Sequence, residues 1–246
     1  MAKSALIVGA SGSGKSTSGR NLDPATTFWI NVANKELPFR SKGYKPVKMG
    51  TPPKNISDAE LMTGLKTKIE KDTNMVITSD TSLVIAVMRH ISEEMPHIKR
   101  IIVDDSQYLA AFEFMKKVNV KGFEKFNTMG QNIFNLAHVK YDLRDDLIIF
   151  YMTHADEFRD AEGNLSVKAK TLGKVVDGVV TLEGLYTIVL YAGVELNKDK
   201  KPEYYFYTKN NGINTCKTPI GMFEEDKIGN DLLVVEEAIN EYYSQD

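Results

Sequence analysis

The sequence contains a single cysteine, Cys216, and only four histidines in 246 residues. One cysteine excludes an internal disulfide, and with scattered histidines it excludes a zinc site of ordinary ligand spacing. No apolar run approaches the ~20 residues of a membrane helix, and the apolar opening Ala5–Val8 is too short for a signal-peptide core. We therefore expect a cytoplasmic protein that has no disulfide and no membrane partner.

The overall composition is that of a globular protein, but its charge is unevenly distributed. Hydrophobic residues make up 42% and charged residues 26%, which excludes disorder in the bulk of the chain. The net charge is −2, yet residues 224–246 hold eight acids and one base, which leaves 30 bases and 25 acids, or +5, elsewhere. An acidic end on a basic body is compatible with a nucleic-acid partner. A solvated helix face is the simpler explanation of the acids.

Apolar runs alternate with helical patterns along the first part of the chain, which predicts crossover units and a mainly parallel sheet flanked by helices. The four prolines in residues 33–56 predict a long loop there. The predicted strands are 4–8, 26–31, 75–78, 100–104 and 146–153, and the predicted helices are 15–22, 57–71, 80–94, 107–117 and 124–143.

The pattern changes after residue 153, where two antiparallel hairpins are predicted, one over 157–166 and one from 186–194 to 203–208. A last helix is predicted over 231–243. We find no internal repeat and no linker, so the sequence predicts one α/β domain over 1–246. Its parallel core would span about 4–154, with antiparallel additions and an acidic C-terminal helix over about 155–246.

One complete phosphate-binding motif follows the first predicted strand. The glycines let backbone N–H groups approach a phosphate chain, and the helix that follows directs its N-terminal N–H groups at the same place. We expect Lys15 to reach the β and γ phosphates of ATP and the Ser16 hydroxyl to bind Mg²⁺. The motif G-x-x-x-x-G-K-[ST] and the residue after it are Gly9, Ala10, Ser11, Gly12, Ser13, Gly14, Lys15, Ser16 and Thr17.

A second motif supplies the acid that such a site needs beside its metal. The apolar run Ile101–Asp104 ends in an aspartate, which is the Walker B pattern, so we expect Asp104 to bind Mg²⁺. The next residue, Asp105, is either a second acid near the metal or the N-cap of the following helix.

On these two motifs, and on the order of the elements over residues 4 to about 210, the chain resembles the RecA-like P-loop ATPases. Among them it is most similar to phage-encoded nucleotide-binding proteins related to RecA/UvsX-type recombinases. The resemblance implies a RecA-like core, Mg²⁺-dependent ATP hydrolysis, and assembly on DNA as a ring or filament with replication or recombination partners. It also implies that Asp104 holds the metal through water and that Thr153-His154 senses the γ-phosphate. A hydrogen-bonded histidine at a strand end is the alternative for His154.

The acid that activates the attacking water departs from the family pattern. The resemblance places a glutamate near the end of the strand after the P-loop helix, but the first acid there is Glu36, already in the predicted loop. Asp105 is the substitute, and turnover would be slow if neither acid is well placed. The resemblance also implies that a lysine among Lys168, Lys170 and Lys174 reaches a neighbouring subunit's γ-phosphate, although surface lysines are the simpler reading.

Residues 35–54 hold six bases and one acid, with Phe39 and Tyr44 among them. Cations with interleaved aromatic rings are typical of a single-stranded DNA platform. The alternative is a solvated loop whose rings anchor it to the core. A second basic run, over residues 116–125, lies where RecA-like proteins place a DNA-facing loop.

Three functions remain open at this stage. The first is a DNA-stimulated ATPase of recombination, annealing or replication. The second is a P-loop nucleotide or small-molecule kinase, but that class usually carries an arginine-rich lid, and only Arg144 and Arg159 occur after residue 100. The third is an ATP-gated scaffold or switch with little turnover.

Overall fold

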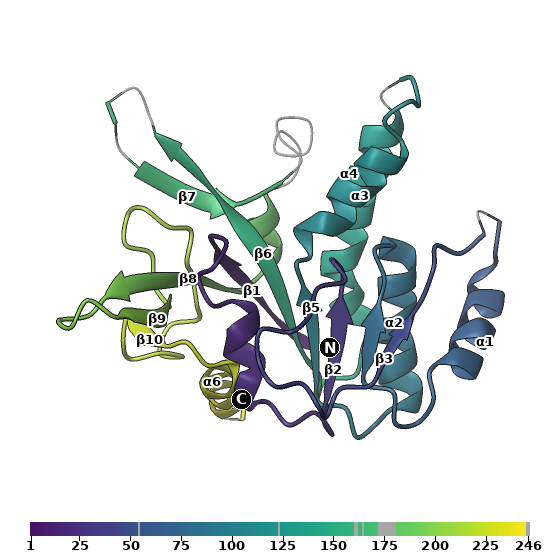
Figure 1. Cartoon of the computed structure of the whole chain (residues 1–246), viewed down its shortest axis with the longest axis horizontal. Helices are drawn as coiled ribbons and strands as arrows, with labels where there is room; N and C mark the ends of the chain where they lie inside the picture. The colour runs from purple at the N-terminus through teal and green to yellow at the C-terminus, as the bar shows by residue number, and fades with distance from the viewer. Residues whose placement is uncertain (54, 123, 160–161, 164, 172–180, 245–246) are drawn as a thin grey trace.

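The computed structural model describes residues 1–53, 55–122, 124–159, 162–163, 165–171 and 181–244. These residues build one ten-stranded sheet with helices on both faces (Figure 1). Within the described ranges, no helix is long and apolar enough to cross a membrane. The strands are β1 (Lys3–Gly9), β2 (Thr27–Asn31), β3 (Pro46–Lys48), β4 (Met75–Ile77), β5 (Arg100–Asp104), β6 (Ile148–Arg159), β7 (Leu165–Ala169), β8 (Ile188–Leu196), β9 (Pro202–Tyr207) and β10 (Lys227–Gly229).

The sheet order is β10-β9-β8-β1-β6-β5-β2-β4-β3, and β7 pairs with β6 off this path. All neighbours from β8 to β3 are parallel, whereas β9, β10 and β7 pair antiparallel. The predicted α/β class, with a mainly parallel sheet, flanking helices and later antiparallel strands, is confirmed. Because β8 is parallel to β1, the parallel sheet also includes a strand from the region where we expected only antiparallel additions.

The helices begin where the sequence provides capping groups. Ser57 and Glu60 form both bonds of a capping box at the start of α1, and the Asp80 and Asp231 side chains cap α2 and α6. These starts agree with the predictions. The α-helices are α1 (Asp58–Lys68), α2 (Thr81–Glu94), α3 (Gln107–Lys116), α4 (Glu124–His138) and α6 (Leu232–Tyr243), and the 3-10 turns are η1 (Ser16–Asn21), η2 (Val139–Asp142) and η3 (Leu182–Leu185).

Three local predictions need correction. The helix expected over 15–22 is only the six-residue 3-10 turn η1. The long loop predicted over 33–56 contains β3, which begins at Pro46; a proline fits there because β3 pairs with β4 alone, at the edge of the sheet. The strand predicted over 146–153 continues as β6 to Arg159, since its second half pairs with β7.

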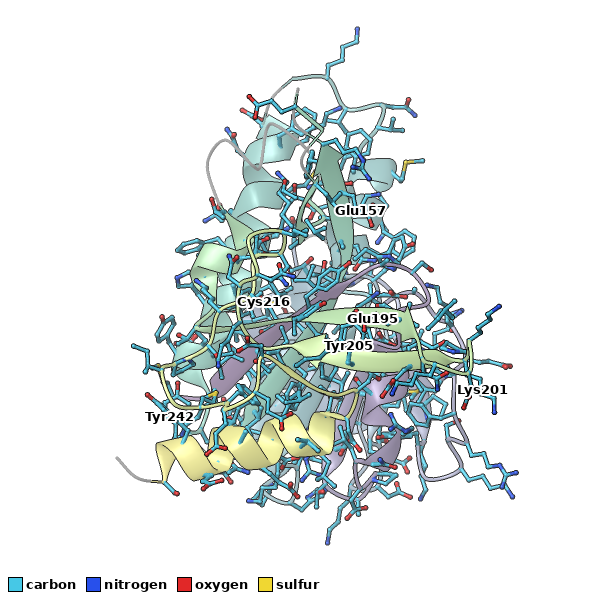
Figure 2. All side chains as sticks on the ribbon, turned by 90° about the vertical axis from the view of Figure 1, so that its left-hand side faces the viewer. Glu157, Glu195, Lys201, Tyr205, Cys216 and Tyr242 are labelled. Atoms are coloured by element: carbon cyan, nitrogen blue, oxygen red, sulfur yellow. The ribbon has the colours of Figure 1, made fainter. Side chains whose placement is uncertain are left out.

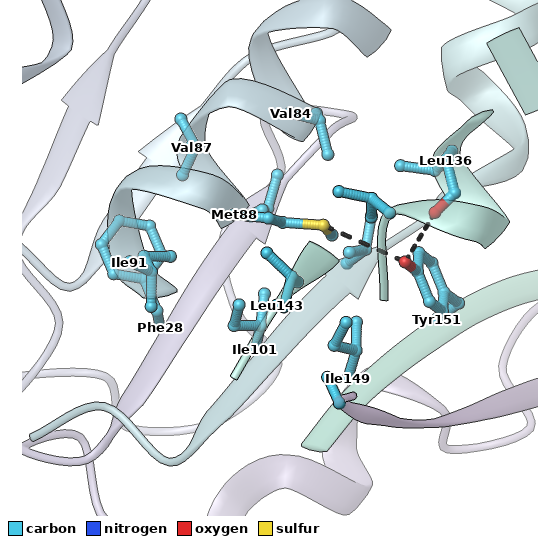
Figure 3. Close-up of a cluster of buried hydrophobic side chains, with 14 of the residues drawn as sticks. Phe28, Val84, Val87, Met88, Ile91, Ile101, Leu136, Leu143, Ile149 and Tyr151 are labelled. Carbon is cyan, nitrogen blue, oxygen red and sulfur yellow. Dashed lines mark hydrogen bonds between the residues drawn. The ribbon is translucent and has the colours of Figure 1, made fainter. Parts of the chain in front are cut away.

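Alternating side chains of the central strands form two hydrophobic layers. On β2, Phe28 and Ile30 face α1, α2 and α4, whereas Trp29 faces α6. Figure 3 shows the first layer, in which the buried Tyr151 hydroxyl donates to the Leu136 carbonyl oxygen at 2.9 Å. Figure 2 shows the molecule from the left-hand side of Figure 1, where α6 lies below the β8–β9 hairpin and Lys201 marks the hairpin tip. Both faces are packed, so polar side chains gather at the strand ends.

Candidate functional site

The sheet order brings the two sequence motifs together at the carboxyl ends of the parallel strands. Gly9, at the end of β1, is in register with His154 of β6, and Asp104, at the end of β5, is in register with Asn31 of β2. Since β6 lies between β1 and β5, His154 stands between the P-loop and the aspartate. Open α/β sheets bind ligands at this edge.

The P-loop adopts backbone angles that require glycine at two of its positions. Gly12 and Gly14 have φ angles of +78° and +87°, which other residues rarely adopt. At Gly9 a side chain is excluded by space, because a Cβ would lie 2.7 Å from the Ala192 carbonyl oxygen. The Lys15 ammonium is turned into the loop, donating to the Gly9 and Ala10 carbonyl oxygens at 2.8 Å each. Burial lowers the pKa of Lys15 to about 8.

The side chains of Ser16 and Asp104 contact each other, although the two residues are 88 positions apart in sequence. The Ser16 hydroxyl donates to Asp104 Oδ1 at 2.8 Å. Burial, reinforced by the neighbouring Asp105 charge, raises the pKa of Asp104 to about 6. The carboxylate therefore lies where a cation would strongly favour its ionised form.

The oxygens of Ser16 and Asp104 fit Mg²⁺, which typically takes one or two protein oxygens and completes its shell with water and substrate phosphates. In the described part of the chain, no group of three or more His, Cys, Asp or Glu side chains could hold a metal on its own. The donor set thus suits a metal that arrives with a phosphate chain.

Asp105 is the centre of a second polar cluster beside the first. Its φ of +59° is unusual for a residue other than glycine, and strain of this kind concentrates at functional sites. Its carboxylate lies 2.6 Å from Lys35 Nζ and 3.3 Å from His154 Nε2. The Tyr108 ring closes the cluster, with Lys35 Nζ 5.2 Å from its centroid and the His154 ring edge-on at 5.9 Å. The pair with Asp105 raises the pKa of Lys35, whereas burial and the Lys15 charge lower that of His154.

Lys35 is a site residue that the sequence analysis did not identify, since it counted Lys35 among the bases of the DNA loop. It is positioned by Asn31, the last residue of β2. The Asn31 side chain donates to the Lys35 carbonyl oxygen at 2.6 Å and accepts from the Lys35 N–H at 3.2 Å. The available signal was an amide side chain at a strand end, four residues before the lysine.

A cavity of about 700 Å³ joins these groups, a size usual for a small-molecule site. Lys15, Ser16 and the two aspartates line one end of it, and Glu36 lies on its wall as an exposed side chain. All of the predicted catalytic side chains line this cavity. Asp105 and His154 contact each other, Asp104 bonds to Ser16 and Lys15 bonds to the loop carbonyl oxygens, whereas Glu36 only borders the cavity. Asp105 is therefore the better placed of the two candidate acids.

Two of the three lysines predicted to act on a neighbouring subunit are described, and both lie away from this cavity. Lys168 Nζ lies 4.7 Å from the centre of the Phe158 ring. Lys170 is exposed and borders a separate, small cavity that Thr153 and Gln107 also line. Lys174 lies outside the described residues. Within this subunit, neither described lysine lines the phosphate cavity.

The aromatic residues of the basic loop are anchors, as the alternative reading held. The Tyr44 and Phe39 rings each pack edge-on against Trp29, with centroids 5.7 Å apart, and Tyr44 is buried. The prediction that Tyr44 stacks on DNA bases is therefore wrong, because the core covers its ring. In the second basic run, Lys117 pairs with Glu113 at 2.6 Å and Phe123 lies outside the described residues.

No protein-family model and no curated protein matches the chain. The fold defines it as an α/β protein with a mostly parallel mixed sheet, and its polar cavity lies at the carboxyl ends of the strands. The function is therefore inferred from the geometry of these residues.

Proposed function

We propose that the protein binds ATP and hydrolyses it with Mg²⁺. The observation that carries the proposal is the 2.8 Å hydrogen bond between Ser16 and Asp104, which joins the P-loop to the acid at the end of β5. An accidental glycine-rich turn would not be expected to contact a buried carboxylate with a pKa raised to about 6. Such a contact is expected in a site that binds a metal ion together with a phosphate chain.

Each residue then has a definite task. Lys15, already pointing into the loop, exchanges its two carbonyl partners for phosphate oxygens, and the backbone N–H groups of the loop surround the same phosphates. Ser16 and Asp104 would hold the magnesium ion, which when bound neutralises charge developing on the transferred phosphoryl group. Asp105 orients and deprotonates the attacking water, and His154 hydrogen-bonds the terminal phosphate from the end of β6.

The strand order supports the RecA-like part of the proposal. In a RecA-like enzyme the strand that senses the γ-phosphate must end between the P-loop and the acid that holds the metal. β6 has this position, with His154 in register with Gly9 and 3.3 Å from Asp105. The proposed class is thus a RecA-like ATPase of the type found in phage recombination and replication.

Single-stranded DNA is the proposed stimulating partner, and a ring or filament is the proposed assembly. The support is electrostatic: Arg40, Lys42 and Lys48 are exposed, and none of them pairs with an acid within the described residues. Lys45 is already paired with Asp72. Phosphate contacts by such cations would be independent of sequence.

One observation favours the nucleotide-gated switch as a second candidate. Lys35 lies 2.6 Å from Asp105, and a carboxylate held by an ammonium group is a weak general base. Turnover then requires Lys35 to move away, for instance to the terminal phosphate. Without that movement, the protein would bind ATP and change partners with little hydrolysis.

ATP hydrolysis measured with and without single-stranded DNA, over a salt series, tests these functions. The ATPase proposal expects Mg²⁺-dependent phosphate release that DNA accelerates and salt suppresses. Tight ATP binding with negligible phosphate release in both arms would favour the switch. Phosphate transfer to a nucleotide or small molecule would favour a kinase, and absence of ATP binding would refute the site.

A further inference from the structure

The phosphate cavity extends well beyond the groups that a triphosphate would occupy. Lys15, Ser16, Asp104 and Asp105 line one end, as described above. The wall continues past Thr17 to a second group of residues that no proposed step uses. This group, here called the far wall, consists of Arg20, Pro202, Glu203, Tyr204 and Asn230.

Tyr204 presents an aromatic ring beside the P-loop itself. On β9 it is in register with Val194 of β8, two residues beyond Ala192, which is in register with Gly9. The ring lies so close to the loop that a Cβ on Gly14 would be 3.0 Å from Tyr204 Cδ1. The residue is nevertheless 43% exposed. The ring is therefore accessible from the cavity, where it could pack against a flat ligand group.

Asn230 provides a second, independent observation on the same wall. Its side-chain oxygen also lies 3.0 Å from the Cβ position at Gly14, so Asn230 and Tyr204 flank one point of the loop. The residue is 6% exposed, and its amide nitrogen Nδ2 has no hydrogen-bond partner among the residues that the structure describes. Leaving a buried donor unpaired costs about 1–3 kcal/mol, and a ligand in the adjoining cavity would recover that cost by accepting from Nδ2.

Arg20 fixes the geometry of the far wall. Its guanidinium donates to the Asn230 carbonyl oxygen at 2.7 Å and to the Thr17 carbonyl oxygen at 3.2 Å. The turn after the P-loop and the segment between β10 and α6 are thereby joined. The far wall thus combines an aromatic ring, a side-chain amide and an arginine in the same cavity as the phosphate-binding residues.

We infer that the far wall is the nucleobase subsite of the nucleotide site, and that it selects purine nucleoside triphosphates. This inference rests on the proposed function, since it takes the phosphate end as given. The Tyr204 ring stacks on the base, and the Asn230 amide donates to a ring nitrogen or carbonyl at the base edge. A purine is preferred because its two fused rings cover more of the tyrosine face than a pyrimidine does.

Calorimetric titration of the magnesium-loaded protein with ATP, GTP, CTP and inorganic tripolyphosphate tests the subsite. In the wild type, ATP and GTP should bind more tightly than CTP and more tightly than tripolyphosphate. Tyr204→Ala should weaken ATP binding by roughly 5- to 150-fold, the range of one aromatic stacking contact. The ratio of the ATP and tripolyphosphate Kd values should rise correspondingly, and Tyr204→Phe should restore it. Asn230→Ala should weaken ATP more than tripolyphosphate.

Tyr141→Ala is the matched control, since Tyr141 is 55% exposed and does not line the cavity. It should leave all four affinities unchanged. If the wild type binds neither ATP nor tripolyphosphate, the proposed function fails. If it binds both, but Tyr204→Ala folds and leaves the ratio unchanged, or CTP binds as well as ATP, the subsite is refuted and the phosphate site stands.

Discussion

Asp104 combines burial with a carboxylate charge that its neighbours Ser16, Lys15 and Lys35 balance only in part. Its pKa is raised to about 6, so between about pH 4 and 6 the folded state binds a proton that the unfolded state has released. The free energy of unfolding of the ligand-free protein therefore falls as the pH rises through that window. At neutral pH the ionised carboxylate costs about 3 kcal/mol, because each pKa unit corresponds to about 1.4 kcal/mol.

The first prediction concerns Asp104→Asn. The asparagine keeps an oxygen for the Ser16 hydroxyl, so the variant without ligand should be more stable than the wild type, by about 3 kcal/mol at pH 7.5 and about half that at pH 5. It should also lose the magnesium-dependent part of the stabilisation by ATP, which for the wild type is roughly 2.7 kcal/mol at 100 times the Kd. Urea unfolding with and without Mg-ATP measures both effects. An Asn variant that is less stable at pH 7.5 would contradict the electrostatic account.

Lys15 is the second residue-scale test. Lys15→Ala should abolish ATP binding or reduce turnover by at least about 100-fold, since it removes the charge that faces the phosphates. The fold should survive, because burial of the ammonium is unfavourable, as its pKa of about 8 indicates, and the side chain is outside both hydrophobic layers. Radiometric phosphate release measures the loss of turnover, and a thermal melt checks that the variant is folded. A variant with undiminished ATPase activity would refute the site.

At the scale of elements, η1 is held against the sheet by Gly19. A Cβ there would lie 2.8 Å from the Trp29 ring, which is fully buried and also contacts Phe39 and Tyr44. The P-loop segment can therefore approach β2 only without a side chain at this position.

The third prediction follows from that contact. Gly19→Ala should destabilise the protein by about 1–3 kcal/mol, because the tryptophan must shift, and it should weaken ATP binding by displacing the turn after Lys15. Gly64→Ala is the control: Gly64 lies inside α1 with no atom near its Cβ position, so alanine should stabilise by about 0.5–1 kcal/mol. The denaturant midpoints of the two variants and the wild type measure these changes in stability. Equal effects at both positions would contradict the packing argument.

An element could be predicted from the sequence when the interactions that form it are local. The start of α1, the run of β5 and the P-loop were predictable, because a capping box, an apolar run ending in aspartate and a glycine pattern each act within a few residues. β3 and the outer half of β6 were not, since both are strands only through their partners β4 and β7. The same distinction holds in the site: Lys15 and Asp104 belong to motifs, whereas Lys35 and Tyr204 reach the cavity through a loop and a hairpin.

At the scale of the whole molecule, the acidic end is tied to the body of the protein. Glu236 of α6 is buried and lies 2.6 Å from the Arg100 guanidinium at the start of β5, and Lys209 pairs with Asp226 at 2.8 Å. Some of the eight acids are therefore structural, and a solvated helix face describes them only in part. Because these two acids have cationic partners of their own, they offset little of the charge of the exposed cations in residues 35–54.

The last prediction concerns those cations and single-stranded DNA. If Arg40, Lys42 and Lys48 contact phosphates, affinity should fall steeply with salt, since each neutralised phosphate contributes about −0.7 to the slope of log K against log salt. Replacing all three by alanine should flatten that slope by about 2 and weaken all sequences alike. Replacing Tyr44 should instead lower stability, because its ring packs on Trp29.

The control for this triple variant removes the same charge from cations that already have partners and lie outside both basic runs. Lys66, Lys99 and Arg89 pair with Glu94, Asp146 and Asp142 at 2.6, 2.7 and 3.0 Å. Their replacement by alanine lowers the net charge by three but removes no cation from the loop, so the slope should change little. Fluorescence anisotropy with a labelled oligonucleotide and Mg-ATP measures both. Equal slopes in the two variants would mean that net charge alone attracts DNA. Absence of wild-type binding at low salt would refute the DNA partner and leave the switch and the kinase as the competing functions.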